Sequence, residues 1–298
     1  MLKALIVRFI AAASMLAAAA PAGALSTARL PGWVCGQGAP PLFFDGFESG
    51  DAFHREPSYG SGGAYPGAQT RSVAVFGQPR DYYLYVPTGY PFAAPAPLLL
   101  VLHGAGGAGT APAAAQWLRD QWSAQAQAGG FLVAAPVASG SQGGWSPSFD
   151  YPMFQAILDD VAAHYNIDAS RIHGWGYSAG GHVMHDLALR QRSGVPDIRT
   201  FAGYGISAGV LQQWACQPPA NCPALLAQAA RKIPVDLRVG TQDYYYPAVQ
   251  ADRDAFLAAG WNAGDTLSYG SFPEGHLVFP WHFPDTWQFL CPLQRRLD

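Results

Sequence analysis

Short apolar runs alternate with longer segments of mixed apolar and polar residues along most of this chain. Residues 97–103, Pro-Leu-Leu-Leu-Val-Leu-His, are almost entirely apolar, which is typical of a strand buried on both faces of a sheet. Residues 151–165 carry apolar side chains at helical spacing and predict an amphipathic helix. The short apolar runs predict strands near residues 81–86, 98–102, 131–135, 172–177, 200–206, 235–239 and 266–272.

The order of these elements predicts the class of fold. Helical patterns fill most of the gaps between the strands, and strands that alternate with helices form a mostly parallel sheet with helices on both faces. Sites in such α/β folds lie at the carboxyl ends of the strands. Since 298 residues are enough for one such core, we assign residues 78–298 to a single α/β domain.

Two segments precede that domain. Residues 1–24 resemble a secretory signal peptide, with Lys3 and Arg8, an apolar stretch at 9–20 and small residues at 22–24. Because the apolar stretch is too short for a membrane anchor, we expect a secreted or periplasmic protein. Residues 25–77 are rich in Gly, Pro and Ser, and predict an irregular segment.

The charge of the chain limits its partners. The formal net charge is −3, only 12% of the residues are charged, and no long stretch rich in Lys and Arg occurs in the sequence. Nucleic-acid binding needs a basic patch that neutralises phosphates, so we expect no nucleic-acid partner.

The first candidate for chemistry is Ser178, in the pattern Gly176-Tyr-Ser-Ala-Gly180. This is the G-x-S-x-G pattern of a nucleophile elbow, where a serine occupies a strained turn between a strand and a helix. Residues 172–177 predict the strand and 181–190 the helix, while 168–171 predict a turn before them. Gly176 and Gly180 are expected because a side chain at either position would collide with a neighbouring element.

An acid and a base should follow the serine in chain order, each after a strand. Asp243 is the predicted acid because it leaves the strand at 235–239, whereas Asp236 lies inside that strand. Asp252 and Asp254 are expected on the solvated face of the next helix. His276 is the predicted base, in the loop after the last strand.

Other histidines are weaker candidates for the base. His282 stands between Trp281 and Phe283, where we expect it to pack at the start of the final helix, but it remains an alternative. His164 and His173 precede the serine, and chain order excludes them.

Attack on a carbonyl group also requires N–H donors for the oxyanion that forms. The backbone N–H of Ala179 is one predicted donor. The second should come from Ala105 or Gly104, in the glycine-rich loop that follows the strand ending at His103.

Four segments together resemble a known family: residues 100–104, 159–172, 176–182 and 240–243. They are similar to secreted serine esterases of the α/β-hydrolase fold, especially the group of polyhydroxybutyrate depolymerases and feruloyl or acetylxylan esterases. The resemblance covers residues 78–291. It implies Ser178 as nucleophile, Asp243 as acid and His276 as base, with oxyanion donors at Ala179 and in the loop after His103. The two-step acyl transfer expected of these residues needs no cofactor.

The chain also departs from that family. Members often carry a cysteine or glutamine in the oxyanion loop, where this chain has Ala105-Gly-Gly107, and a tryptophan directly after the base, where it has Leu277. No second substrate-binding module or Thr-rich linker is evident in the sequence. A soluble or oligomeric ester is therefore the expected substrate.

Aromatic residues near the predicted loops are candidates for substrate binding, although packing would explain them as well. They are Trp145, Tyr177, Tyr244 and Trp281.

Four cysteines in an exported chain predict two disulfides. Cys216 and Cys222 enclose a short Pro-rich loop and form the expected local pair; Cys35 and Cys291 would then tie the N-terminal segment to the last helix. The sequence leaves the other pairings open.

No metal site is predicted. His182, His185 and Asp186 are close in sequence, but they lack the H-E-x-x-H pattern and a third ligand. An acidic turn at 43–51 is expected to be exposed to solvent.

Three classes of function remain. The first is an esterase that forms an acyl-enzyme by two-step acyl transfer. The second is a serine peptidase of the prolyl-oligopeptidase kind, although so short a chain has no room for a gating domain. The third is a non-catalytic protein that binds a glycan or polymer.

Overall fold

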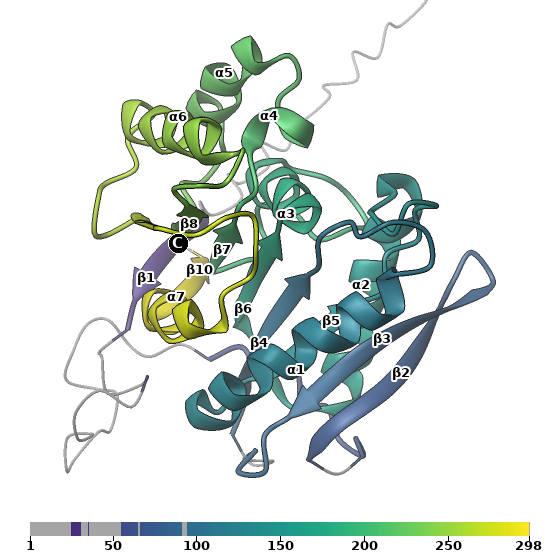
Figure 1. Cartoon of the computed structure of the whole chain (residues 1–298). Helices are drawn as coiled ribbons and strands as arrows, with labels where there is room; N and C mark the ends of the chain where they lie inside the picture. The colour runs from purple at the N-terminus through teal and green to yellow at the C-terminus, as the bar shows by residue number, and fades with distance from the viewer. Residues whose placement is uncertain (1–24, 31–34, 36–54, 65, 91–93, 298) are drawn as a thin grey trace, which may run out of the picture.

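A single large sheet with helices on both faces forms the centre of the molecule (Figure 1). The structure is a computed structural model that describes residues 25–30, 35, 55–64, 66–90 and 94–297. Its strands are β1 (Leu25–Arg29), β2 (Gly67–Val75), β3 (Gln78–Val86), β4 (Ala96–Leu102), β5 (Leu132–Pro136), β6 (Ile167–Tyr177), β7 (Gly203–Ser207), β8 (Val235–Gly240), β9 (Leu267–Phe272) and β10 (Leu293–Leu297). Its helices are α1 (Ala111–Gly129), α2 (Pro147–His164), α3 (Ala179–Leu189), α4 (Leu211–Trp214), α5 (Cys222–Ala227), α6 (Tyr246–Ala258) and α7 (Phe283–Leu290), with the short 3-10 turns η2 (Pro219–Asn221) and η3 (Pro280–His282).

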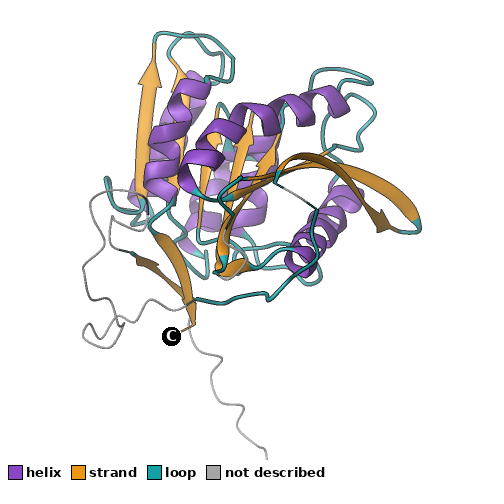
Figure 2. Cartoon of the chain, turned by 90° about the horizontal axis from the view of Figure 1, so that it is seen from below, coloured by secondary structure: helices purple, strands orange, loops and turns teal. Residues whose placement is uncertain are grey.

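The strands of the large sheet lie in the order β2-β3-β5-β4-β6-β7-β8-β9. From β5 to β9 all neighbours are parallel, while β2, β3 and β5 pair antiparallel. The pair β1 and β10 forms a separate antiparallel sheet. Figure 2 colours the helices, strands and loops differently and shows the helices packed beside the strands. The predicted α/β fold with a mostly parallel sheet is confirmed.

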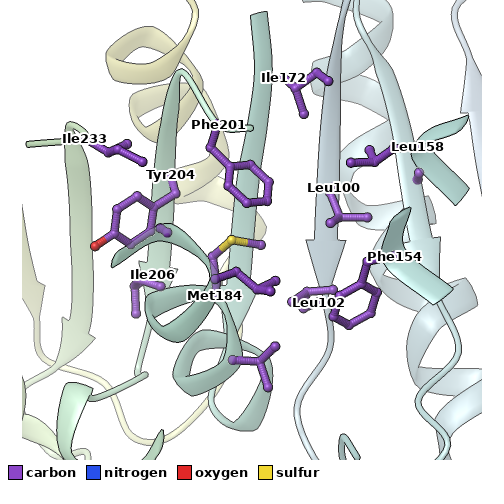
Figure 3. Close-up of a cluster of buried hydrophobic side chains, with 14 of the residues drawn as sticks. Leu100, Leu102, Phe154, Leu158, Ile172, Met184, Phe201, Tyr204, Ile206 and Ile233 are labelled. Carbon is purple, nitrogen blue, oxygen red and sulfur yellow. The ribbon is translucent and has the colours of Figure 1, made fainter. Parts of the chain in front are cut away.

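The central strand β4 shows why the sheet is covered on both faces, because each of its residues is buried. Leu100 and Leu102 pack with Phe154 of α2 and Met184 of α3 on one face (Figure 3). The alternate residues of β4 join the second core cluster, which includes side chains of α1 and α7. Helices of both layers therefore bury the strand, as its unbroken apolar run predicts.

Residues 25–77 differ from the prediction of an irregular segment. Strand β1 pairs with β10, and β2 is the outermost strand of the large sheet, paired along its length with β3. In β2 only Val73 and Val75 are buried, so an edge strand of this kind carries a weak apolar signal. The predicted boundary at residue 78 falls inside the hairpin of β2 and β3 and is wrong as a structural division.

Residues 168–171, predicted as a turn, instead belong to β6. The carboxylate of Asp168 is buried there and accepts hydrogen bonds from the backbone N–H groups of Glu56 and Ser170. These hydrogen bonds allow the polar side chain of Asp168 to be buried within a strand. The sequence pattern does not show these bonds, so it predicts a turn at these residues.

Both disulfides expected from the sequence are present. Cys216 pairs with Cys222, and Cys35 pairs with Cys291 directly after α7. The predicted signal peptide and the acidic turn at 43–51 lie outside the described residues. In the described part of the chain, no helix is both long enough and apolar enough to span a bilayer.

Candidate active site

Ser178 occupies a sharp turn between β6 and α3. Its backbone has a φ of 50° and a ψ of −118°, a conformation that costs free energy for a residue with a side chain. A Cβ atom on Gly176 would lie 2.3 Å from the carbonyl oxygen of Gly180, and one on Gly180 would lie 2.1 Å from that of Leu102. The predicted need for glycine on both sides of the serine is confirmed.

The side chains of Ser178, His276 and Asp243 form one hydrogen-bonded chain. The hydroxyl oxygen of Ser178 lies 2.9 Å from Nε2 of His276, and Nδ1 of His276 lies 2.8 Å from Oδ2 of Asp243. A neutral imidazole can donate Nδ1–H to the carboxylate while Nε2 accepts the serine proton. The structure therefore brings together the three residues that the sequence singled out.

Strand order explains how residues so far apart in sequence meet. Ser178, Asp243 and His276 follow β6, β8 and β9, respectively, and these strands run parallel in one part of the sheet. Parallel strands end at the same edge, so the loops that leave them are neighbours.

Asp243 is held in place by its own loop. Its side chain is fully buried, and Oδ1 accepts a hydrogen bond from the backbone N–H of Tyr245 at 2.7 Å. The backbone N–H of Gln242 donates to the carbonyl oxygen of Glu274 at 2.9 Å, which joins the loops that carry Asp243 and His276. The distance between Asp243 and His276 is thus fixed by both side-chain and backbone contacts.

The competing aspartates have other partners. Asp236 is buried within β8 and is bound by Arg238 and the hydroxyl of Thr286. Asp252 corrects the prediction of a solvated side chain, because it is buried and accepts the backbone N–H of Leu211 at 2.9 Å. Burial raises the pKa of Asp252 to about 7, although that hydrogen bond opposes the change.

Three tyrosine rings surround the imidazole of His276. The ring centroids of Tyr244, Tyr177 and Tyr245 lie 4.4, 5.1 and 5.6 Å from it. The Tyr177 hydroxyl donates to the carbonyl oxygen of His276 at 2.9 Å, and burial followed by the charge of Asp243 raises the pKa of this phenol. The three rings therefore line the surroundings of the imidazole, whose Nδ1 is bonded to Asp243.

His282 lies in the 3-10 turn before α7 and makes no hydrogen bond with the serine. It is buried against Phe272 and Trp281, and neither ring nitrogen has a hydrogen-bond partner among the described residues. Burial, together with the charge of Arg238, lowers its pKa to about 4. The expected packing role of His282 agrees with this position.

The predicted oxyanion donors border Ser178 from two sides. Ala179 begins α3, whose first N–H groups have no acceptor within the helix; the first intrahelical bond runs from His182 to the carbonyl oxygen of Ser178. Gly104 begins the glycine loop, here residues 104–109, and a Cβ atom on it would lie 3.3 Å from Cβ of Ser178. Backbone N–H groups of both elements are therefore near the serine.

His103 holds the start of the glycine loop. Its Nε2 accepts the backbone N–H of Ala138 at 3.3 Å, and its Nδ1 lies 2.8 Å from the carbonyl oxygen of Gly104. These contacts fit a neutral ring protonated on Nδ1, and burial lowers the pKa of His103. The apolar run at residues 97–103 predicts only the end of a strand at His103, and the position of this residue directly before the loop is the one signal in the sequence for its contacts with that loop.

The four aromatic residues predicted to bind substrate occupy different environments. Trp145 is buried, and its indole N–H donates to the carbonyl oxygen of His103. It therefore stabilises the residue that precedes the glycine loop. Tyr177 is half-buried beside His276. Tyr244 and Trp281 are 68% and 58% exposed, which leaves both accessible at the surface around the site.

His182, His185 and Asp186 have structural partners instead of a shared ligand. Nδ1 of His182 accepts the backbone N–H of Val210, Nδ1 of His185 lies 3.3 Å from the hydroxyl of Tyr204, and Asp186 is paired with two arginines. Burial lowers the pKa values of His182 and His185 to about 4 and 3. Within the described ranges, no group of three or more His, Cys, Asp or Glu side chains is arranged to hold a metal ion.

The sequence is similar to two curated proteins, and no family model matches it. It is 33% identical to a protein named "Putative esterase NocK" from Nocardia uniformis subsp. tsuyamanensis, over 51% of this chain and 43% of NocK. It is 30% identical to the bifunctional acetylxylan esterase/xylanase XynS20E of Neocallimastix patriciarum, over 38% of this chain and 17% of XynS20E. The chain thus spans less than half the length of either relative.

The structure is similar to that of the feruloyl esterase module from Clostridium thermocellum, with a TM-score of 0.60. The sequences are 13% identical, and the match covers 80% of this chain and 92% of the module. This likeness shows a shared fold and confirms the one that the family resemblance implied.

Proposed function

We propose that this chain, which has the α/β-hydrolase fold, hydrolyses carboxylic esters with Ser178 as nucleophile, His276 as base and Asp243 as acid. The observation that carries the proposal is the hydrogen-bonded chain from the serine hydroxyl through the imidazole to the buried carboxylate, with distances of 2.9 and 2.8 Å. The sequence similarity to esterases supports the same class of reaction.

Each residue has a defined task in this reaction. His276 takes the proton of Ser178 as the hydroxyl oxygen attacks the ester carbonyl carbon, and Asp243 stabilises the imidazolium that forms. The N–H of Ala179 and an N–H of Gly104 or Ala105 stabilise the oxyanion. Collapse of this intermediate breaks the bond to the alcohol, which leaves with the proton from His276.

Water completes the cycle. His276 removes a proton from a water molecule that attacks the acyl-enzyme, and the acid is released as the proton returns to Ser178. No cofactor takes part in this scheme.

The proposed substrates are small or oligomeric esters. Esters like those of polyhydroxybutyrate depolymerases, feruloyl esterases and acetylxylan esterases are the first to screen, because the sequence motifs resemble that group. We also propose that the protein acts outside the cytoplasm, since its two disulfides are stable in oxidising compartments. Neither a nucleic-acid partner nor a membrane anchor is part of the proposal.

The decisive experiment compares wild-type protein with Ser178→Ala in the hydrolysis of p-nitrophenyl acetate and butyrate. We expect the variant to lose at least a thousandfold in kcat. Ser148→Ala, an exposed serine on α2, is the matched control and should keep wild-type activity. A fluorophosphonate probe should label the wild-type protein on Ser178, as read by mass spectrometry.

Other outcomes would point to the alternatives. Faster cleavage of p-nitroanilides than of the matching esters would indicate a peptidase. Activity retained in Ser178→Ala would move the nucleophile elsewhere, and an inert wild-type protein that binds glycans or polymers would indicate a binding function.

A further inference from the structure

A cavity of about 180 Å³ opens beside the proposed active site. Its walls come from the start of the glycine loop, from the N-terminal half of α1, from Tyr177 and from Val278, which follows His276 closely in sequence. Larger cavities among the described residues, of 300 to 450 Å³, are lined by residues outside this site.

The walls of this cavity are mostly apolar. Ala114, Leu118 and Val278 contribute aliphatic groups, and Trp117 contributes an indole that is 45% exposed at the rim. None of the described residues that line the cavity carries a charged side chain, and the imidazole of His103 is held neutral by its burial. A charged group would lose its hydration here without gaining a partner.

Two lining residues connect the cavity to the nucleophile. Tyr177 directly precedes Ser178, and Gly104 is so close to both that a Cβ atom on it would lie 2.8 Å from the Tyr177 ring and 3.3 Å from Cβ of Ser178. A group covalently linked to a carbonyl carbon at Ser178 can therefore reach the cavity within a few bonds.

We propose that this cavity is the specificity pocket for an uncharged, apolar group of the ester, no larger than one benzene ring or a chain of several carbons. This inference rests on the proposed ester hydrolysis at Ser178 and adds the substrate class to it. The size follows from the volume, because a dry apolar cavity of about 150 Å³ is large enough to bind benzene. The pocket accepts the acyl group or the alcohol group, and the test below distinguishes them.

The first arm of the test varies the acyl group of p-nitrophenyl esters from acetate to hexanoate, and the second varies the alcohol of acetate esters from methyl to hexyl. In the series that varies the group bound by the pocket, kcat/KM rises about fourfold for each methylene that the pocket buries. The increase ends when the pocket is full, and the series that shows it identifies the bound group as the acyl group or the alcohol. Esters that carry a carboxylate at the same end, such as a succinate monoester, are poor substrates.

Ala114→Phe fills the pocket from α1 without changing the glycine loop. We expect the ratio of kcat/KM for the long ester to that for acetate to fall at least tenfold. Ala113→Phe, at the exposed neighbouring position, is the matched control and keeps the wild-type ratio. Trp117→Ala widens the rim and shifts the optimum to larger groups, which provides a second readout if Ala114→Phe is unstable.

Calorimetry measures how tightly the intact esters bind to Ser178→Ala. This measurement tests the specificity pocket independently of the proposed ester hydrolysis. Long esters should bind to Ser178→Ala more tightly than the acetate ester does, and this difference should disappear in Ser178→Ala/Ala114→Phe. Such a result supports the pocket even if the wild-type protein hydrolyses no ester. Two results would overturn the assignment of this cavity as the specificity pocket and would leave the esterase proposal standing. The first is serine-dependent hydrolysis with no chain-length preference in either series. The second is a chain-length preference that is unchanged in both Ala114→Phe and Trp117→Ala.

Discussion

The indole Nε1 of Trp145 donates a hydrogen bond to the carbonyl oxygen of His103 over 2.9 Å. The two rings also pack together, with centroids 4.7 Å apart. This contact links the loop before α2 to the residue that precedes the glycine loop. The proposed oxyanion donors of that loop therefore depend on a buried tryptophan that does not itself reach the serine.

Trp145→Phe tests that dependence. The variant keeps an aromatic ring but leaves the buried carbonyl of His103 without its donor, which costs about 1–3 kcal/mol of stability. We expect kcat to fall roughly five- to tenfold, because oxyanion donors stabilise the transition state only at the correct distance. Trp261→Phe is the control, since this buried indole also donates to a carbonyl, that of Ile233, away from the site. Equal losses of kcat in both variants would contradict the link.

His276→Ala and His282→Ala identify the base. Loss of the proposed base at His276 should lower kcat about a thousandfold or more, while His282→Ala should keep most of the activity and lower the unfolding temperature, because it removes a buried ring. Steady-state kinetics and thermal melts measure the two effects. The reverse pattern in kcat would assign the base to His282.

Tyr244 covers one face of the proposed base. A tyrosine ring stabilises a cation at this distance by about 0.5–1 kcal/mol at an exposed site, so Tyr244→Ala should lower kcat roughly two- to fivefold and Tyr244→Phe much less. Tyr59→Ala, an exposed tyrosine elsewhere, is the control. If Tyr244→Phe loses as much as Tyr244→Ala, the hydroxyl group is responsible and the ring is not.

Asp252 should make stability depend on pH. Its pKa is about 7 in the folded chain because it is buried, whereas an unfolded aspartate releases its proton near pH 4. The folded state therefore binds more protons between these values, and the free energy of unfolding falls as pH rises from 4 to 7. A shift of about three pKa units corresponds to at most ~4 kcal/mol.

Asp252→Asn removes this dependence and keeps an acceptor for the N–H of Leu211. The difference in unfolding free energy between the variant and wild type should increase from pH 4 to pH 7, as measured by urea unfolding at several pH values. Asp254→Asn changes an exposed aspartate of the same helix and should show no such trend. A flat difference for Asp252→Asn would mean that the carboxyl ionises normally.

The two disulfides should differ in their contribution to stability. The bond between Cys35 and Cys291 closes a loop with a sequence separation of 256, against 6 for Cys216 and Cys222. In the chain-entropy description the longer loop stabilises by about 3 kcal/mol more. Cys35→Ser/Cys291→Ser should therefore melt at a lower temperature than Cys216→Ser/Cys222→Ser. Equal melting temperatures would show that the N-terminal segment contributes little to the folded state.

Parts of the site could be read from the sequence because their causes are local. The glycines around Ser178 are required by the turn itself, and the proposed acid and base follow strands whose apolar runs are evident. Edge strand β2 was missed because few of its side chains are buried, and Asp252 was misplaced because a helical pattern does not show what packs against each face.

The sequence by itself determined the α/β class, the elbow at Ser178 and the short list of aspartates and histidines that could accompany it, since these depend on residue type and spacing. Only the tertiary structure decided that His276, and not His282, lies 2.9 Å from the serine hydroxyl, that Trp145 supports a loop from behind, and that an apolar cavity borders Gly104. Strand order and loop packing bring residues about 100 positions apart within hydrogen-bonding distance, and no local pattern contains that information.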